Sequence, residues 1–429
     1  MPLAEPRGFE TTSHTGGSKM TRRERVLSAL KHKEPDKIPV DCGAMRSTGI
    51  MGVAYNRLKK HLGIEGGETK IHDTIQQLCI PEQWYLDMFQ VDVVDLARTC
   101  ADDPADWRDW PLPDGSPARV PAWLRIEKRG SSWVCVNEED EAIAEMPDSS
   151  YFFDQTIWPL YGIHKEKFDD LPHHMNKVMW SCMTDPLWKN AKDPNFYAML
   201  REKAKRLYEE TDYAIMIGFG GNLFEWGQFI YRIDEFLANL ITHRNEMERM
   251  LDKLTEIHIE NLEPVLQAVS PYVQVIQMGD DLGMQSGPMI SPNLYREIFF
   301  PRHKRLYQMI KETTDMHVFL HTCGAISEYI PDLIEAGVDI INPVQITAAG
   351  MEPGKLKSEY GKDIVFWGGG VDTQHVLPHA SPEEVREEVR KNSEIFMKGG
   401  GFVFTQIHNI LAEVPPENIL AMYDEVNRM

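Results

Sequence analysis

The stretch HVFLHTCGAISEYIPDLIEAGVDIINP, residues 317–343, carries the pattern that decides the fold. Two apolar runs, 317–321 and 338–343, flank an amphipathic segment. Both runs are nearly continuous rather than alternating, which is typical of strands buried on both faces of a parallel sheet. The segment between them predicts a helix, because a crossover between parallel strands usually contains one. The stretch therefore predicts a strand, a helix and a second, parallel strand.

The same unit recurs along the whole chain. Apolar runs lie at 38–41, 91–96, 213–218, 272–279, 317–321, 338–343, 364–368 and 402–406. Amphipathic helices are expected between them, and eight strands that alternate with helices predict a parallel (β/α)8 TIM barrel, an α/β fold. The alternative is an open, doubly wound sheet. No G-x-G-x-x-G run follows the first strand, which weakens that alternative.

Several helix starts can be read from capping residues. A helix over 22–33 is expected to end before Pro35. Ser291 precedes a proline at the first position of another helix. Ser381 is followed three residues later by Glu384, which is the pattern of a capping box. These signals place helices where the barrel requires them.

Residues 100–207 interrupt the alternation of strands and helices. We expect one barrel domain over 21–429, with an insertion at about 100–207 after the second strand and a disordered, polar leader at 1–20. The insertion is rich in Asp, Pro and Trp, and 123–140 reads as a hairpin. It leaves the carboxyl end of a strand, so it could form a lid over an active site. The alternative is a surface elaboration that mediates contact in a homodimer.

Composition excludes several classes of protein. Acidic residues outnumber basic ones by 66 to 45, for a formal net charge of -21, and such a surface repels nucleic acid and anionic lipid. No apolar stretch approaches 18 residues, so no membrane span is expected. The start of the chain lacks the apolar core of a signal peptide, and six cysteines in 429 residues do not indicate a disulfide scaffold. A cytoplasmic location is expected.

The most informative local pattern is His321 and Cys323 at the end of a predicted strand. Residues at i and i+2 of a strand point to the same face, so both side chains are expected at the barrel mouth. Imidazole and thiolate are ligands that zinc prefers, and a catalytic zinc needs a third protein ligand. His408, after the eighth strand, could supply it, because strand ends converge on one central space. The alternatives are a buried His and Cys, with His408 as a metal-free general acid or a structural histidine.

Other polar residues follow the remaining strands. Asp280 and Asp281 are adjacent acids after the fourth strand, and we expect one of them to face the barrel axis. Asp280 could carry a proton, support a ligand histidine or accept a hydrogen bond from substrate, and a helix N-cap is the alternative. Glu225 stands beside Trp226 after the third strand. Three further residues follow the sixth and seventh strands and are expected at the mouth, the last of them exposed: Asn342, Gln345 and Asp372.

Several segments resemble the uroporphyrinogen decarboxylase superfamily, which includes cobalamin-dependent methyltransferases. They are MTRRERVLSALKHKEPDKIPV (20–40), GDDLGMQSGPMISP (279–292), HTCGAISEYIPDLIEAGVDIINPVQ (321–345), WGGGVDT (367–373) and GGGFVFTQIHNILAEVPPENI (399–419). The resemblance covers most of the chain from Met20 onward. It implies a TIM barrel, in agreement with the strand count.

The resemblance favours the corrinoid methyltransferase branch. Decarboxylases carry a Met-Arg that holds substrate carboxylates and a second arginine nearby, but here the run MRSTGI provides only Arg46. The methyltransferases carry H-x-C, which His321 and Cys323 match, and a third zinc ligand, usually cysteine, near the C-terminus. That position falls on His408, nine residues before Glu417. One thiolate instead of two makes the metal a stronger Lewis acid, which favours activating an ether or amine over a thiol.

The function implied is a zinc-dependent methyltransferase. It would move a methyl group between a small substrate, such as an aryl methyl ether in O-demethylation or an amine, and a corrinoid on a partner protein. Zn²⁺ would be held by His321, Cys323 and His408. Catalytic roles are expected for Asp280, His408 and Glu225. Substrate contacts are expected from Arg46, Asp95, Asn342, Gln345 and Asp372.

Three alternatives remain open. The same site could transfer methyl from a methylcorrinoid to a thiol or to tetrahydrofolate. A metal-free lyase related to the decarboxylases could use Arg46 as a carboxylate anchor, with Asp95 or His408 in proton transfer. A corrinoid carrier without catalysis would normally show D-x-H-x-x-G, which the chain lacks. The corrinoid must therefore arrive on a separate protein.

Overall fold

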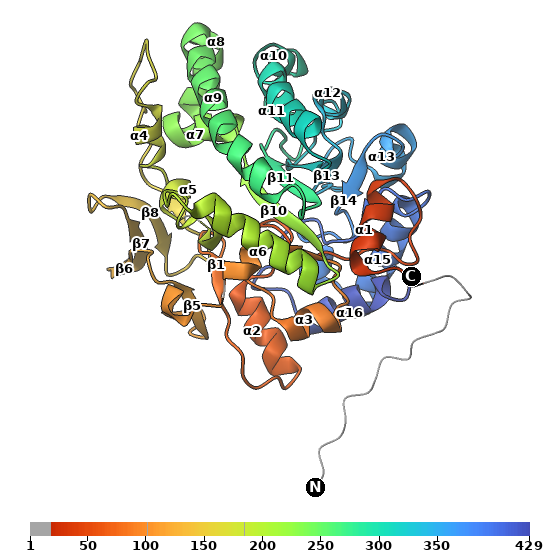
Figure 1. Ribbon diagram of the computed structural model, residues 1–429. Helices are drawn as coiled ribbons and strands as arrows, with labels where there is room; N and C mark the ends of the chain where they lie inside the picture. Colours follow the sequence, from red (N-terminus) through yellow and green to blue (C-terminus); the bar gives the residue numbers. More distant parts are fainter. Residues whose placement is uncertain (1–18, 101, 184) are drawn as a thin grey trace.

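A curled sheet of parallel strands forms the centre of the protein (Figure 1). The computed structural model describes residues 19–100, 102–183 and 185–429, so the leader expected at 1–20 lies outside the described residues except for Lys19 and Met20. Seven strands pair in the order β15-β14-β13-β12-β11-β10-β3. They are β3 (Val93–Asp95), β10 (Ala214–Gly220), β11 (Val275–Gly279), β12 (His317–His321), β13 (Ile340–Asn342), β14 (Val365–Trp367) and β15 (Phe402–Val403).

Val40 joins the two edges of this sheet. It forms a parallel bridge with Phe404, and the Asp41 amide donates to the Phe404 carbonyl at 2.9 Å. On its other side the Asp92 amide donates to the Val40 carbonyl at 2.8 Å. The first strand, expected at 38–41, is therefore only a single bridge, because Pro39 has no N–H to extend the pairing. The predicted (β/α)8 barrel is confirmed, with Val40 between β15 and β3.

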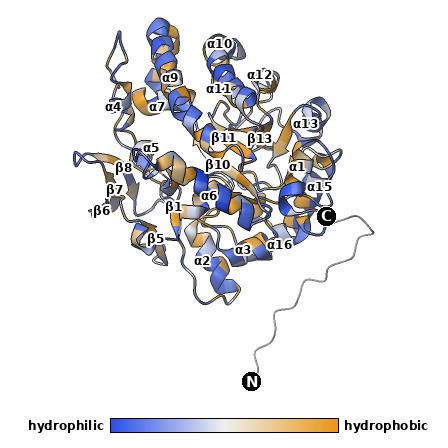
Figure 2. Ribbon diagram, viewed as in Figure 1, coloured by the Kyte–Doolittle hydropathy of each residue, from blue (hydrophilic) through white to orange (hydrophobic). Residues whose placement is uncertain are grey.

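Helices surround the sheet and alternate with its strands. They are α1 (Arg22–Leu30), α2 (Gly52–His61), α3 (Gln83–Met88), α6 (Phe196–Glu210), α7 (Phe224–Tyr231), α8 (Ile233–Thr242), α9 (Arg244–Val269), α10 (Pro292–Ile298), α11 (Phe300–Thr313), α12 (Ile330–Ala336), α13 (Pro353–Tyr360), α14 (Val376–His379), α15 (Pro382–Phe396) and α16 (Pro416–Val426). The capping box predicted at Ser381 is confirmed, and the structure shows another at Thr21, which was not predicted. Figure 2 shows apolar residues along the central strands and polar residues on the outer faces of α9 and α11.

The inside of the barrel is filled by apolar side chains. Alternate residues of the strands, such as Met216, Phe319 and Trp367, form one buried cluster with Val26 and Leu30 of α1. Helix α1 thus closes the end of the barrel where the strands begin. The opposite end, where the strands finish, is left for polar residues, as is usual for this fold.

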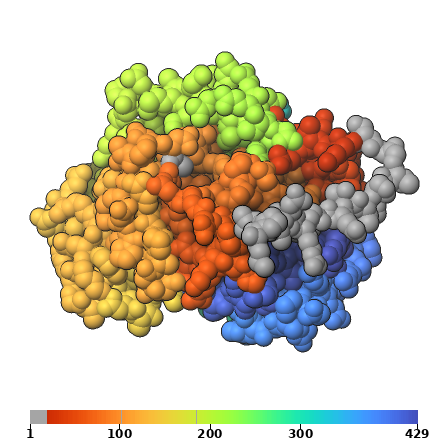
Figure 3. All heavy atoms as spheres, turned by 90° about the horizontal axis from the view of Figure 1, so that it is seen from below, coloured from red at the N-terminus to blue at the C-terminus, as the bar shows by residue number. Residues whose placement is uncertain are grey.

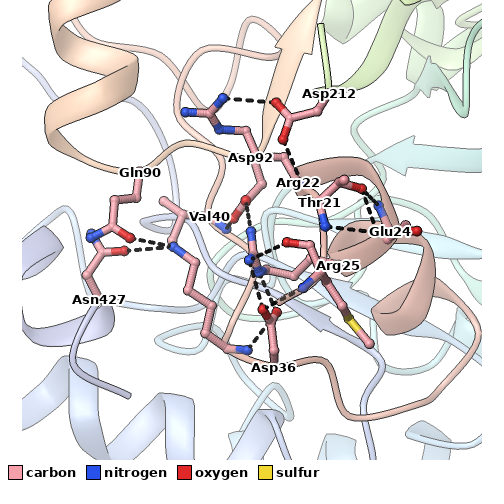
Figure 4. A network of polar contacts seen from close by, with 12 residues as sticks. Thr21, Arg22, Glu24, Arg25, Asp36, Val40, Gln90, Asp92, Asp212 and Asn427 are labelled. Atoms are coloured by element: carbon pink, nitrogen blue, oxygen red, sulfur yellow. Dashed lines mark hydrogen bonds and ion pairs between the residues drawn. The ribbon is translucent and has the colours of Figure 1, made fainter. Parts of the chain in front are cut away.

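A buried ion pair fastens α1 to the strands, as Figure 4 shows. Arg25 is only 3% exposed and its guanidinium contacts the carboxylates of both Asp36 and Asp92. Asp92 also accepts a hydrogen bond of 2.9 Å from the Val40 amide. The same cluster therefore holds the closing strand and the helix that covers the barrel floor.

The insertion forms a lobe beside the barrel, drawn in orange and yellow in Figure 3. Its strands are β4 (Trp107–Pro111), β5 (Pro117–Pro121), β6 (Ile126–Arg129), β7 (Ser132–Val136), β8 (Ala142–Pro147) and β9 (Asp154–Gln155), in two antiparallel sheets, and its short helices are α4 (Leu171–Met175) and α5 (Met179–Cys182). The hairpin predicted at 123–140 is confirmed as β6 and β7. Helix α6 already packs on α9, so the lobe ends before Phe196.

The lobe is attached at the mouth side of the barrel. The Phe153 amide donates to the carbonyl of Ile75, beside the hairpin of β1 (Ile71–Asp73) and β2 (Leu78–Cys79). The Leu160 amide donates to the carbonyl of Ile230 in α7, the helix that follows β10. A lid function for the lobe stays a prediction. None of the helices in the described ranges is long and apolar enough to cross a membrane.

Candidate metal centre

Three side chains from two strand ends meet at the barrel mouth. His321 is the last residue of β12, Cys323 follows two residues later, and His408 lies in the loop after β15. One ligand atom from each lies within 4.8 Å of the other two, and Cys323 Sγ is 3.4 Å from His321 Nε2. A tetrahedral zinc with ordinary bond lengths separates sulfur and nitrogen by about 3.6 Å. The donor set and its spacing therefore fit a metal ion.

Asn342, from the neighbouring strand β13, fixes the orientation of the His321 ring. The Asn342 Nδ2 donates to the Trp367 carbonyl at 2.8 Å, which turns its Oδ1 toward His321 Nδ1 at 2.7 Å. His321 Nδ1 must then carry the proton, and Nε2 keeps its lone pair. Nε2 is the nitrogen that faces Cys323. Asn342 is fully buried and holds the ring of this candidate ligand, and its expected contact with substrate stays a prediction.

His408 is available as a ligand. Burial, followed by the nearby His321 ring, lowers its pKa to about 4, so the imidazole is neutral at pH 7. The two rings lie 5.8 Å apart between centroids. No group in the described part of the chain hydrogen-bonds either ring nitrogen of His408. An inward, neutral imidazole without a partner is suited to metal binding.

Acidic neighbours act strongly on Cys323. Burial, then the carboxylates of Asp281 and Glu225, raise the pKa of the Cys323 thiol well above its usual value. Asp281 Oδ1 accepts a hydrogen bond of 2.8 Å from the Cys323 amide. The same oxygen lies 3.6 Å from His321 Nε2. A cation among these groups would favour the thiolate and offset the repulsion. Ser47, whose Oγ is 3.2 Å from His321 Nε2, also borders the site.

Of the two adjacent acids, Asp281 faces the site and Asp280 does not. Asp280 is fully buried and accepts hydrogen bonds from the amides of Leu223, Phe224 and Glu225, at the start of α7. Its fourth donor is His303 Nε2 at 3.0 Å. This environment corresponds to the alternative in which Asp280 caps the N-terminus of a helix. The capped helix is α7, which precedes Asp280 in the sequence, and not the helix that follows it. The sequence indicated that one acid faces inward and could not identify Asp281 as that acid.

The carboxyl group of Glu225 lies beside Asp281. Its Oε2 accepts from Asn222 Nδ2 at 2.6 Å and from the Asp281 amide at 3.1 Å. Burial, then repulsion by Asp281 and Asp280, raises the pKa of Glu225 well above its usual value. The neutral form of this carboxyl group is therefore favoured over the charged form. A catalytic role for Glu225 stays a prediction.

Arg46 and Asp95 belong to a second polar group at the mouth. Arg46 Nε is 3.5 Å from Asp73 Oδ2. Burial, then the Asp185 carboxylate, raises the pKa of Asp95 to about 7. His72 Nδ1 is 3.1 Å from Asp185 Oδ2. No sequence motif indicated His72 or Asp185, and Asp185 lies in the insertion.

Gln345 and Asp372 bind the protein backbone. Gln345 Oε1 accepts the Gly324 amide at 2.9 Å, next to Cys323, and its Nε2 donates to Gln285 Oε1 at 2.7 Å. Asp372 was expected to be exposed at the mouth, but it is 4% exposed and its Oδ1 accepts the Gln374 amide. The exposure prediction is wrong because Asp372 turns inward to cap the turn that follows β14.

The fold and site together define a (β/α)8-barrel protein whose mouth gathers groups suited to metal binding and proton transfer. Residues 183–429 match the family described as Uroporphyrinogen decarboxylase (URO-D). The match spans more than half of the chain, so the chain belongs to the uroporphyrinogen decarboxylase family. The family resemblance read from the sequence is confirmed.

Two curated relatives and one solved structure extend this comparison. The chain is 25% identical over 225 residues to a uroporphyrinogen decarboxylase from Psychromonas ingrahamii, in a match that covers 50% of this chain and 59% of that protein. A decarboxylase from Chloroherpeton thalassium is 25% identical over 221 residues, with 49% and 58% covered. The chain thus spans less than two thirds of these relatives' length. A methyltransferase from Methanosarcina mazei superposes with a TM-score of 0.57 at 16% identity, covering 95% of this chain and 98% of that chain. It confirms the fold, and the comparisons together indicate an enzyme.

Proposed function

We propose that the protein is a zinc-dependent methyltransferase that passes a methyl group from a small methylated ether or amine to a corrinoid on a partner protein. The observation that carries the proposal is the meeting of His321, Cys323 and His408 at the barrel mouth, within 4.8 Å of one another. The structural neighbour named as a methyltransferase supports it through the shared fold. The same geometry would serve the reverse transfer, from a methylcorrinoid to a thiol or tetrahydrofolate.

The three residues would hold zinc and leave one coordination position for the substrate heteroatom. Zinc supplies Lewis acidity there, which withdraws charge from the heteroatom and makes it a better leaving group. A single thiolate among the ligands keeps that acidity high. Asn342 orients His321 for this role. The hydrogen bond from the Cys323 amide to Asp281 Oδ1 positions Cys323.

The chain's own contribution to the chemistry is a proton. A corrinoid on the partner protein would supply a cobalt nucleophile able to accept the methyl group, and the electron pair of the broken carbon–oxygen bond would stay on oxygen. Burial, then Asp281 and Asp280, raise the pKa of Glu225 well above its usual value, so this carboxyl group would donate a proton to the leaving oxygen. The leaving group would depart as an alcohol or phenol.

A second candidate function is a metal-free decarboxylase-like lyase. Arg46, which is half-buried beside Asp73, and Asp95, whose pKa is raised to about 7, favour it, because they pair a carboxylate anchor with a group able to exchange protons. The curated relatives are named as decarboxylases. A decarboxylase activity would require no metal.

Metal content distinguishes the two functions. The full chain, purified without chelator, is analysed by plasma mass spectrometry beside Cys323→Ala, with Cys100→Ala as a control because Cys100 is half-buried and outside the site. We expect Cys323→Ala to contain one equivalent of zinc less than the wild type. The control Cys100→Ala should contain as much zinc as the wild type. Methyl transfer to cob(I)alamin, followed by absorbance, then tests the reaction. Equal zinc in all three proteins, or none after zinc is added, would favour the lyase.

A further inference from the structure

A second group of metal-ligating side chains lies apart from the three candidate zinc ligands. It consists of His72, Asp95 and Asp185, here called the Asp185 cluster. One ligand atom from each lies within 4.8 Å of the other two. The residues come from three separate segments: the hairpin strand β1, the end of β3, and the start of a 3₁₀ turn, Pro186–Trp188, in the insertion. His72 and Asp185 are 4% and 7% exposed.

The charges of this cluster do not balance. Its charged neighbours are Arg46 and Asp73, which lie 3.5 Å apart. Three carboxylates, those of Asp73, Asp95 and Asp185, thus share one guanidinium and one imidazole. Two carboxylates that share a buried place repel each other unless a proton or a cation lies between them. A divalent cation would neutralise them fully.

His72 and Asp95 of the cluster border an internal space of the size of one ion, whose lining does not include Asp185. A cavity of about 20 Å³ is lined by His72 and Asp95, together with Cys42 and Val94. A space of about 10–15 Å³ already accommodates a water molecule. His72 Nδ1 contacts Asp185, whereas Nε2 has no hydrogen-bond partner among the residues that the structure describes. Because His72 lines the cavity, this imidazole is available to a ligand there.

The cavity lies close to a groove on the surface. This groove, of about 510 Å³, shares Ile80, Pro81 and Arg98 with the cavity lining. The Arg98 guanidinium is held by the Pro81 carbonyl and by Gln83 Oε1 at 3.2 Å.

We propose that the Asp185 cluster binds one divalent cation that ties the insertion to the barrel. One imidazole and two carboxylates, without a thiolate, suit Mn²⁺ or Zn²⁺. The ion links a loop of the insertion to β1 and β3, so its role is to hold the lobe at the mouth. None of the ligands of this site belongs to the His321 site, although Asp95 is also the group that exchanges protons in the lyase alternative.

Mn²⁺ binding to the full chain tests the proposal. In a Cys323→Ala background, which silences the first site, electron paramagnetic resonance is expected to count one bound Mn²⁺ per chain. Adding Asp185→Asn is expected to weaken binding at least tenfold. Asp212→Asn serves as the matched control, because Asp212 is a carboxylate in an exposed ion pair with Arg22. Limited proteolysis of the lobe should slow when Mn²⁺ is present, and only where Asp185 is intact.

Each outcome decides the question. No bound Mn²⁺ in the Cys323→Ala protein, or equal binding with and without Asp185→Asn, overturns the proposal. If Asp185→Asn fails to fold, His72→Gln replaces it, because glutamine keeps a polar side chain at that position. The Cys323→Ala protein alone still gives the stoichiometry if both fail. Loss of zinc from the first site with Mn²⁺ still bound at the second would show that the two proposals stand or fall separately.

Discussion

Gly283 and Gly324 cross so closely that a Cβ on either would collide with the backbone around the other. A Cβ on Gly283 would lie 2.6 Å from the Cys323 carbonyl oxygen and 2.8 Å from the Ala325 nitrogen. A Cβ on Gly324 would lie 2.4 Å from the Gly283 carbonyl carbon. The loop that carries Asp281 is therefore packed directly on the loop that carries Cys323, and side chains of minimal size make this contact feasible.

Gly283→Ala is expected to displace Cys323. Overpacking of this kind destabilises a fold by about 1–3 kcal/mol, and we expect zinc affinity to fall at least tenfold as the sulfur moves. Competition with a chromophoric chelator measures the affinity, and urea unfolding measures the stability. Gly287→Ala in the same loop is the control, since a Cβ there meets nothing within 4 Å. Equal affinity in both variants would show that the crossing does not position Cys323.

Removing the acceptor behind His321 should weaken metal binding. Asn342→Leu leaves His321 Nδ1 without its partner, and loss of such a supporting group lowers metal affinity by about 10–100-fold. The same chelator competition applies. Asn418→Leu is the control, because Asn418 is a buried amide that donates to two backbone carbonyls far along the chain from His321. Unchanged affinity in Asn342→Leu would mean that His321 is not a ligand through Nε2.

Asp280→Asn should affect stability more than chemistry. The carboxylate accepts four hydrogen bonds, and removing one member of a buried charged group costs about 3–5 kcal/mol. Urea unfolding should show this loss, while zinc content stays that of the wild type. The exposed Asp315→Asn serves as control. A variant within about 1 kcal/mol of wild type but without turnover would instead support the proton-carrier role expected from the sequence.

Glu225→Gln should separate proton donation from structure. The Glu225 Oε2 that accepts from Asn222 and Asp281 can be replaced by the glutamine oxygen, so both hydrogen bonds persist. The proton is lost, and general acid catalysis is worth about 10²–10⁴-fold. We expect kcat for methyl transfer to fall by that amount with metal content unchanged. A donor with a good leaving group, such as a nitrophenyl ether, should recover most of the rate, and a failure to do so would argue against a proton-donor role.

The free energy of unfolding should fall in acid because His258 is buried in the folded protein. Burial lowers the pKa of His258 to about 4, below the value of about 6.5 for an unfolded chain. Between these values the unfolded chain binds a proton that the folded chain does not, so stability is lost as pH falls from 6.5 toward 4. From pH 7 to pH 5 this group alone removes about 2 kcal/mol.

Glutamine at this position isolates the effect. His258 Nε2 donates to the Asn222 carbonyl at 2.9 Å, and the amide of His258→Gln can make a similar bond without titrating. Urea unfolding at both pH values should show a decline that is smaller in the variant by about 2 kcal/mol. Equal declines would show that His258 does not stay neutral in the folded protein.

The strands and their polar ends could be predicted, because both depend on local patterns. Apolar runs and capping residues located the strands and helices of the barrel. The i, i+2 spacing of His321 and Cys323 predicted that both side chains point to the same side at the end of β12. Parity could not decide between Asp280 and Asp281, because the residues after a strand no longer alternate regularly. The direction of each carboxylate depends on α7, whose amides bind Asp280.

Contacts between segments that are distant in the sequence could not be predicted. Asp185 meets His72 only because the insertion folds back on the hairpin of β1 and β2, and nothing in its local sequence specifies that path. Asn342 was recognised as a polar group at a strand end, but its role behind His321 depends on the Trp367 carbonyl of the next strand. Pro39 was included in the first strand, whose pairing it reduces to one bridge.

The bridge between Val40 and Phe404 has a consequence for how the protein is made. The first and last strands of the barrel are neighbours, so the barrel cannot close until residues 402–404 have left the ribosome. His321 and Cys323 emerge earlier than His408, so a nascent chain would offer the proposed metal ion two of its three ligands at most. Loading of the proposed metal would therefore be tied to closure of the barrel. A chain that stalls during synthesis would release its ion rather than trap it.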